Sequence, residues 1–153
     1  MSKITTSLWF DGNAEEAANF YTSIFRDSKI TSISRYSDAG PGPKGSVMVV
    51  AFELNGNPFI AINGGPQYKF TPAVSLLINC DTQDEIDHYW DNLLTGGTPQ
   101  RCGWLTDKFG LSWQVVPSMM GELMSNPQTG GRVAAAMMTM IKLDIAELRR
   151  AAA

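Results

Sequence analysis

The feature that most constrains the fold is a pattern of strand, helix cap and helix that occurs twice. In the first copy, the β-forming residues 4–10 precede Asn13 and Glu16, which have the spacing of a capping box. In the second copy, residues 73–80 precede Thr82 and Glu85 at the same spacing. A shift of 69 positions superposes the apolar faces of the two helices: Ala17 on Ile86, Tyr21 on Trp90, Ile24 on Leu93 and Phe25 on Leu94. The identities differ, so the repeat is one of pattern.

Each predicted helix is followed by further strands. After the first, residues 29–36, 46–54 and 58–63 have strand composition, and Asn55-Gly56 is a strong hairpin signal. Residues 37–45 hold two prolines and three glycines and are predicted to be a loop. After the second helix, which Gly96-Gly97 ends, residues 98–105 and 111–117 form two more strands. The chain is therefore predicted to be α+β, with duplicated βαβββ units that form curved mixed sheets with outer helices.

The rest of the chain is predicted to be a helical tail. The chain of 153 residues is interpreted as a single domain, residues 1–153, with unit one over about 3–64, unit two over about 71–117 and the tail over 118–153. Val133, Met137, Met140 and Ile141 give the tail an apolar face, and further methionines lie nearby. This face either closes the protein's own core or docks on a second subunit.

Composition excludes several classes of function. The net charge is −3 and there is no basic run, so nucleic acid is not an expected partner. No apolar stretch reaches the length of a membrane span, and residues 1–12 lack the core of a signal peptide. Cys80 and Cys102 match no metal spacing, which favours reduced thiols in a cytoplasmic protein. The single histidine, His88, falls on the polar side of the second helix and is expected to be exposed.

Three segments carry a resemblance to a known family. They are LWFDGNAEEAANFYTSIF, FTPAVSLLINCDTQDEIDHYW with the double glycine that follows, and CGWLTDKFGLSWQVVP. From Lys3 to about Leu148 the chain resembles the vicinal oxygen chelate superfamily, which includes glyoxalase I, extradiol dioxygenases and the bleomycin and fosfomycin resistance proteins. It is most similar to the PhnB-like branch, often labelled 3-demethylubiquinone-9 3-methyltransferase. The resemblance implies a duplicated βαβββ fold and a homodimer.

The resemblance also implies four site positions, because metal-binding members hold their ion on the concave face of the sheets. Matched strand by strand, these positions are Thr6, Glu53, Ser75 and Gln114, and Thr6 and Ser75 are 69 positions apart, the offset of the helices. Side-chain alternation along the strands of Glu53, Ser75 and Gln114 gives opposite faces that are nearly pure apolar. We therefore place all four positions, Thr6 included, on the more polar faces. We expect the more polar faces to line a cup and the helices to cover the apolar ones.

These residue types do not suit a transition metal, which prefers imidazole, thiolate and carboxylate ligands. We therefore predict a pocket without a metal or other cofactor, in which Glu53 is a candidate general base or hydrogen-bond acceptor. Ser75, Gln114 and Thr6 would orient a small-molecule ligand. Alternatively, the site is vestigial, with Glu53 and Gln114 satisfying each other. Trp104 either stacks on a ligand or belongs to the core.

Three classes of function remain open from the sequence: a small-molecule-binding protein, an enzyme, or an interaction module that acts through its Met-rich tail. The methyltransferase label would require S-adenosylmethionine, but no glycine-rich turn from strand to helix supports its binding. Cys102 has no histidine partner in the sequence to activate it as a nucleophile. Asp107, which precedes Lys108, Phe109 and Gly110, is interpreted as a turn residue.

Overall fold

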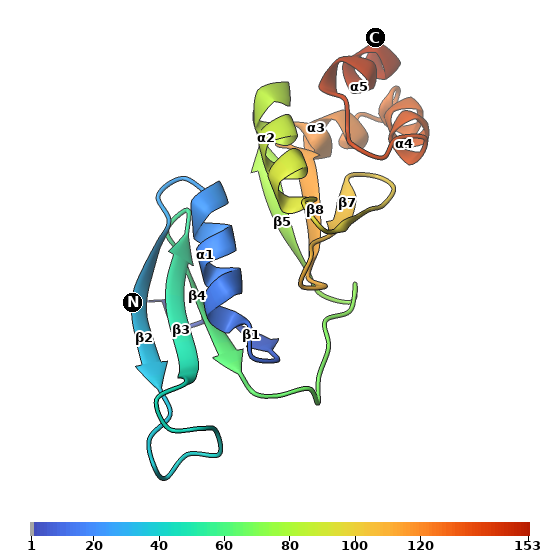
Figure 1. Ribbon diagram of the computed structural model, residues 1–153. Helices are drawn as coiled ribbons and strands as arrows, with labels where there is room; N and C mark the ends of the chain where they lie inside the picture. Colours follow the sequence, from blue (N-terminus) through green and yellow to red (C-terminus); the bar gives the residue numbers. More distant parts are fainter. Residues whose placement is uncertain (1) are drawn as a thin grey trace. The chain divides into compact units, whose positions relative to one another are not determined.

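The computed structural model describes residues 2–153, which form two compact units divided between Phe70 and Thr71 (Figure 1). Each unit has its own four-stranded sheet and its own covering helix. No helix among residues 2–153 is both long and apolar enough to cross a membrane.

Unit one contains β1 (Thr6–Phe10), α1 (Ala14–Ile24), β2 (Lys29–Arg35), β3 (Val47–Leu54) and β4 (Asn57–Asn63). Its sheet has the order β1-β4-β3-β2, with β1 parallel to β4 and the other pairs antiparallel. The apolar face of α1 packs on one side of this sheet, where the ring of Tyr21 stacks on Phe52 and Phe52 stacks on Phe59. Burial of this face is the main stabilising contribution to the unit.

Unit two repeats the same topology. It contains β5 (Ser75–Cys80), α2 (Gln83–Leu93), β6 (Thr98–Pro99), β7 (Trp104–Thr106) and β8 (Ser112–Pro117), and its sheet has the order β5-β8-β7-β6. The first and last strands are again parallel and the others antiparallel. Ile86, Trp90 and Leu93 of α2 are buried, as the spacing predicted. The predicted α+β fold of duplicated βαβββ units is confirmed.

The local signals were correct at two of three positions. Asn55 and Gly56 have φ of +50° and +78° and form the predicted turn between β3 and β4. Thr82 caps α2, because its hydroxyl accepts a hydrogen bond from Glu85 N at 3.2 Å. The capping box predicted at Asn13 is wrong: the Asn13 side chain makes no cap hydrogen bond. The first helical N–H, that of Ala14, instead donates to Asn63 Oδ1 at 2.9 Å, so the end of β4 caps α1.

The tail forms three short helices, α3 (Met120–Ser125), α4 (Gly130–Met138) and α5 (Ile145–Ala152). Val133, Leu143 and Leu148 are fully buried together and form a small core. Half-buried residues pack against this core, among them Val116 at the end of β8 and Met137 and Met140 of the tail. The tail therefore closes a core within its own unit, which was the first of the two alternatives predicted for it.

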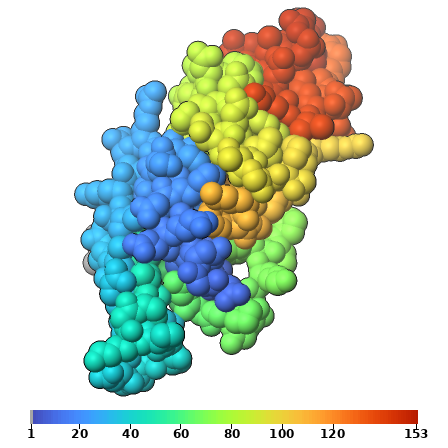
Figure 2. Space-filling view, in the orientation of Figure 1, coloured from blue at the N-terminus to red at the C-terminus, as the bar shows by residue number. Residues whose placement is uncertain are grey.

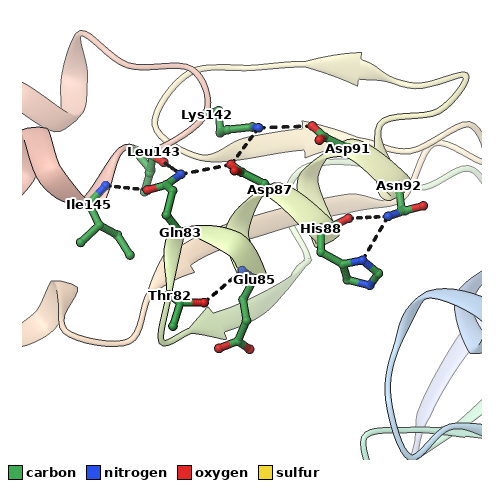
Figure 3. Close-up of polar contacts among 10 residues, drawn as sticks. All are labelled: Thr82, Gln83, Glu85, Asp87, His88, Asp91, Asn92, Lys142, Leu143 and Ile145. Atoms are coloured by element: carbon green, nitrogen blue, oxygen red, sulfur yellow. Dashed lines mark hydrogen bonds and ion pairs between the residues drawn. The ribbon is translucent and has the colours of Figure 1, made fainter.

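Polar contacts join the tail to α2 and to the turn before β7. Gln83 Nε2 donates to Leu143 O at 3.1 Å, and Gln83 Oε1 accepts from Ile145 N at 2.9 Å (Figure 3). Lys142 of the tail forms ion pairs with two carboxylates of α2: its Nζ lies 2.9 Å from Asp87 and 3.2 Å from Asp91. Two backbone hydrogen bonds run to the tail, from Cys102 N to Met140 O and from Gly103 N to Ile141 O. In the space-filling view the tail, orange to red, lies against α2 (Figure 2).

Candidate functional site

The sheet of unit one has a face covered by α1 and a helix-free face. Val50, Phe52 and Leu54 of β3 are buried on the covered face. Glu53 lies on the helix-free face with Val49 and Ala51, and all three are half-buried. The alternation predicted for this strand is therefore confirmed, and Glu53 lies on the more polar side.

Thr6, however, does not lie on the same face as Glu53. In the ladder between β1 and β4 it pairs with Phe59, whose ring belongs to the core beneath α1. Thr6 also shares its side of β1 with Leu8 and Phe10, which are both buried. The expectation that Thr6 lines the polar face is wrong by one residue, and a slip of one residue in a strand exchanges its two faces.

The slip has a definite cause in the turn between β1 and α1. Three residues separate Phe10 from Ala14, whereas only two separate Cys80 from Gln83 in unit two. The helices are therefore offset by 69 positions and the strands by 70. Carrying the helix offset onto the strands pairs Ser75 with Thr6, although its structural counterpart is Thr5.

Thr5 and Glu53 line one hollow of unit one, with a volume of about 540 Å³. Thr31, at the β-bulge of β2, also lines this hollow. The apolar part of its wall includes Ala51, Pro58 and Ile60. Lys29 and Pro58 are the cross-strand neighbours of Glu53. Thr5 and Thr31 were missed from sequence. A gapped comparison of the two units would have identified Thr5, but no sequence signal marks Thr31.

In unit two the structure brings together three predicted site residues. Ser75, Gln114 and Trp104 lie on the face of the sheet opposite α2, and Gln114 Nε2 donates to Ser75 Oγ at 3.0 Å. Trp104 is the direct cross-strand neighbour of Gln114. Trp104 is half-buried, whereas Leu105 and Trp113 occupy the core on the opposite face. Trp104 is therefore a surface aromatic beside polar side chains rather than a core residue.

The donor set of these positions does not fit a transition metal. Among the residues that line the Glu53 hollow, Glu53 alone has a carboxylate, beside the hydroxyls of Thr5 and Thr31. In unit two, Ser75 and Gln114 offer a hydroxyl and an amide that already bond to each other. Across residues 2–153 no three His, Cys, Asp or Glu side chains are grouped so that they could hold a metal ion. Hydroxyl and amide oxygens are weak ligands for zinc, nickel or iron.

The two cysteines are free thiols in different settings. Cys80 is fully buried, and this burial, with the nearby carboxylates of Glu85 and Asp81, raises the pKa of its thiol to about 12. A thiol with such a pKa is protonated and unreactive at neutral pH. Cys102 has φ of +62° at the turn before β7, and its N–H donates to Met140 O. Through this backbone N–H, Cys102 links the tail to the rest of unit two.

Asp107 and His88 are two further polar residues considered from the sequence, and they lie in different surroundings. Asp107 is buried and accepts hydrogen bonds from Phe109 N, Leu111 N and Trp113 Nε1, at 2.8, 3.1 and 2.8 Å. The predicted turn role is confirmed and extends to anchoring a core tryptophan. His88 is exposed, as expected, and its ring lies edge-on to Tyr89.

A further hollow of unit one, of about 470 Å³, lies between the β1–α1 turn and the loop of residues 37–45. Its lining includes Asp11, Glu15 and Tyr36, and it contains none of the predicted site residues. Tyr36 Oη donates to Asn63 O at 2.6 Å and so holds the start of this loop to the end of β4. The loop itself is the protruding cyan lobe in Figure 2.

Comparison with known proteins relates the chain to one family and to several solved structures. The family described as 3-demethylubiquinone-9 3-methyltransferase matches residues 2–116. The chain is 44% identical to the PhnB protein from Bacillus cereus, a match that covers 76% of this chain and 99% of that chain with a TM-score of 0.70. No curated protein matches the chain significantly.

Two more distant structures share the fold alone. The protein PA1353 from Pseudomonas aeruginosa is 22% identical over 75% of this chain and 96% of its own, with a TM-score of 0.62. The fosfomycin resistance protein FosX from Listeria monocytogenes, complexed with Mn(II) and sulfate, is 14% identical over 74% of this chain and 89% of its own, with a TM-score of 0.52.

Proposed function

The chain belongs to the 3-demethylubiquinone-9 3-methyltransferase family, the PhnB-like branch of the vicinal oxygen chelate superfamily, and we propose that it binds a small molecule without a metal ion. The binding surface in unit one is the hollow that carries Glu53. The observation that supports this proposal is the position of that carboxylate, half-buried on the wall of a hollow large enough for a small metabolite.

The chemistry of this hollow favours a ligand with a hydrogen-bond donor or a positive charge. A half-buried carboxylate loses part of its hydration, and a donor from a ligand would replace it. Ala51, Pro58 and Ile60 would contact the apolar part of the same ligand, and the hydroxyls of Thr5 and Thr31 would orient it. Glu53 would act as an acceptor, or as a general base if the ligand carries an acidic proton.

A thermal-shift screen of a metabolite library, with protein treated with EDTA, tests the proposal. We expect some compounds to raise the melting temperature of the wild-type protein and to lose most of that effect on Glu53→Gln, which keeps the shape but removes the charge. Glu16→Gln, an exposed change on α1, is the matched control and should respond like the wild type. Compounds that act only after a divalent metal is added, or equally on Glu53→Gln, would count against the proposal.

The family's description favours methyl transfer as a second candidate function. Methyl transfer would need S-adenosylmethionine, yet the β1–α1 turn has only Gly12 and the β5–α2 turn has no glycine. We expect millimolar S-adenosylmethionine to leave the melting temperature unchanged. A concentration-dependent increase would make the methyltransferase the better candidate.

We also propose that the protein is a cytoplasmic homodimer whose ligand contacts in unit two are Ser75, Gln114 and Trp104. Light scattering of the purified chain would test the oligomeric state. The alternative of an interaction module acting through the tail is weakened, because Val133 is buried and Met137 and Met140 pack against the tail's own core. Met124, Met138 and Ile141 are large apolar side chains of the tail that are exposed, and they are candidates for a subunit contact.

A further inference from the structure

A row of hydroxyl side chains crosses the sheet of unit two. Ser75 of β5 pairs with Ser112 of β8, Ser112 pairs with Thr106 of β7, and Thr106 pairs with Thr98 of β6. Paired residues on neighbouring strands point to the same side of a sheet, so the four side chains form one line on the face opposite α2. We call these four residues the hydroxyl row.

The hydrogen bonds along the hydroxyl row are incomplete at its centre. Ser75 Oγ accepts from Gln114 Nε2, and Thr106 Oγ1 accepts from Gln100 Nε2 at 2.8 Å. Ser112 lies between them and is only 1% exposed, yet within residues 2–153 its Oγ has no hydrogen-bond partner. A buried hydroxyl without a partner is unfavourable and rare in folded proteins. Alanine would fill this position at no such cost.

The surroundings of Ser112 define what could supply the missing partner. On β5, β7 and β8 the face opposite α2 carries no charged side chain, and the tail core packs against its end at Val116. The other residues of this face are Ser75, Leu77, Asn79, Trp104, Thr106, Ser112 and Gln114. An anion placed here would lose hydration without meeting a positive charge. An uncharged carbonyl would accept from the hydroxyls and lose less. Because the Ser112 hydroxyl is enclosed, a ligand would reach it by displacing the half-buried side chains of Ser75, Thr106 or Gln114.

We propose that the hydroxyl row binds an uncharged carbonyl group of a small molecule, an amide or a ketone, with Ser112 as the central hydrogen-bond donor. Trp104 lies two residues before Thr106 on the same face of β7 and is the cross-strand neighbour of Gln114. Its indole provides a flat apolar surface for the body of the ligand. The inference deepens the proposed small-molecule binding and rests on it, but it concerns a surface of unit two that does not include Glu53.

Benzamide and benzoate are matched probes, because they share a flat ring and differ in the charge of the group that the hydroxyl row would bind. Titrated into ¹⁵N-labelled wild-type protein, benzamide should shift the amide resonances of Ser112 and its neighbours in a saturable way. Benzoate should bind at least about tenfold more weakly, because its charge would be desolvated without a counterion.

Ser112→Ala separates a binding role from an unused hydroxyl. Removing an unsatisfied hydroxyl should leave the melting temperature equal or higher, while the affinity for benzamide falls about fivefold through the lost hydrogen bond. Ser112→Cys keeps a similar size with a weaker donor and should give an intermediate affinity, so one folded variant of the two suffices for the test. Ser125→Ala, an exposed change in α3, is the control and should match the wild type.

Equal binding of benzamide and benzoate, or unchanged benzamide affinity in the folded Ser112 variants, would overturn the inference. Failure of the proposed function has a different signature. Glu53→Gln should retain benzamide binding, because Glu53 is not part of the hydroxyl row. If metabolites raise the melting temperatures of Glu53→Gln and Ser112→Ala as much as that of the wild type, both proposals fail. If this increase is lost in Ser112→Ala and kept in Glu53→Gln, only the role of Glu53 fails.

Discussion

At the scale of single residues, Asp107 shows how one buried carboxylate fixes a turn and a core side chain together. Its two oxygens accept from two backbone N–H groups of the β7–β8 turn and from the indole of Trp113. The three donors replace the water that the carboxylate loses on burial, which is the condition for burying a charge at tolerable cost. Asp107 therefore fixes the conformation of the turn and the orientation of Trp113, one of two tryptophans in the core.

Asp107→Ala should lower the free energy of unfolding by roughly 2–4 kcal/mol, because three N–H donors, two of them buried, lose their acceptor. Urea unfolding followed by tryptophan fluorescence measures this change. Asp38→Ala, at an exposed loop residue, should change the stability by less than about 0.5 kcal/mol. A loss at Asp107 no larger than that of Asp38→Ala would show that the turn holds without its anchor.

For single residues, the sequence predicted which face of a strand a side chain occupies, where the strand has a clear alternation. The period of two placed Glu53, Ser75 and Gln114 on the correct faces, because each lies inside a strand with a clear apolar side. The prediction for Thr6 was wrong because β1 begins at this residue and its position was assigned with the 69-residue offset of the helices. Ser112 could not be identified, since an unsatisfied hydrogen bond depends on every neighbour in space.

At the scale of secondary-structure elements, strands and helices were predictable where composition and period agreed. The helices α1 and α2 and the strands around Asn55-Gly56 follow their patterns closely. The cap of α1 was not predictable, because its acceptor, Asn63, is distant in sequence and reaches Ala14 only after β4 has paired with β1. Local sequence can suggest that a helix begins, but not which distant side chain satisfies its first N–H.

The cap of α1 predicts losses of stability of different size when two asparagines are replaced by alanine. Asn63→Ala should cost about 1–2 kcal/mol of stability, since Asn63 accepts from Ala14 N and also donates to Val47 O at 3.1 Å. Asn13→Ala should cost less than about 0.5 kcal/mol, because the Asn13 side chain makes no cap hydrogen bond. Chemical denaturation of both variants measures the difference, and the reverse order of stabilities would contradict this assignment of the cap.

At the scale of the whole molecule, the tail is an integral part of unit two. The family match ends at residue 116, yet α3 to α5 form their own small core against the end of β8. Gln83 and Lys142 add polar contacts between α2 and the tail. Amphipathic spacing predicted the helices, but the partners of the tail became clear only from the structure, because no local signal indicates which neighbour an apolar face will cover.

The ion pair of Lys142 gives this contact a predictable pH dependence. Hydrogen bonds from Lys142 and Gln83 lower the pKa of Asp87. Burial lowers the pKa of Lys142, but its bonds to Asp87 and Asp91 outweigh burial and raise it. Because the folded carboxylate has the lower pKa, its stabilisation exists above pH 4 or so and is lost as pH falls through that pKa. The lysine contribution is present at neutral pH and is lost at strongly alkaline pH.

Lys142→Met should therefore lower the stability at pH 7 by roughly 0.5 kcal/mol, a small value because both partners are partly solvated. The difference from wild type should shrink as the pH falls below about 4, and it should also shrink in 1 M salt. Lys44→Met, which removes a more exposed ion pair with Asp38, is the control. A difference that stays constant down to the lowest pH at which the protein remains folded would mean that lost packing of the lysine stem, rather than charge, explains the effect.

The three-residue turn between β1 and α1 has a consequence for the ancestry of the chain. Two copies produced by a duplication begin with turns of equal length, yet here one turn is a residue longer than the other. Gly12, with φ of +85°, lies in the longer turn, and the shorter turn contains no left-handed residue. For a chain that arose by duplication, this difference corresponds to one inserted or deleted residue. An ungapped alignment of the two halves can therefore match their helices or their strands, but never both.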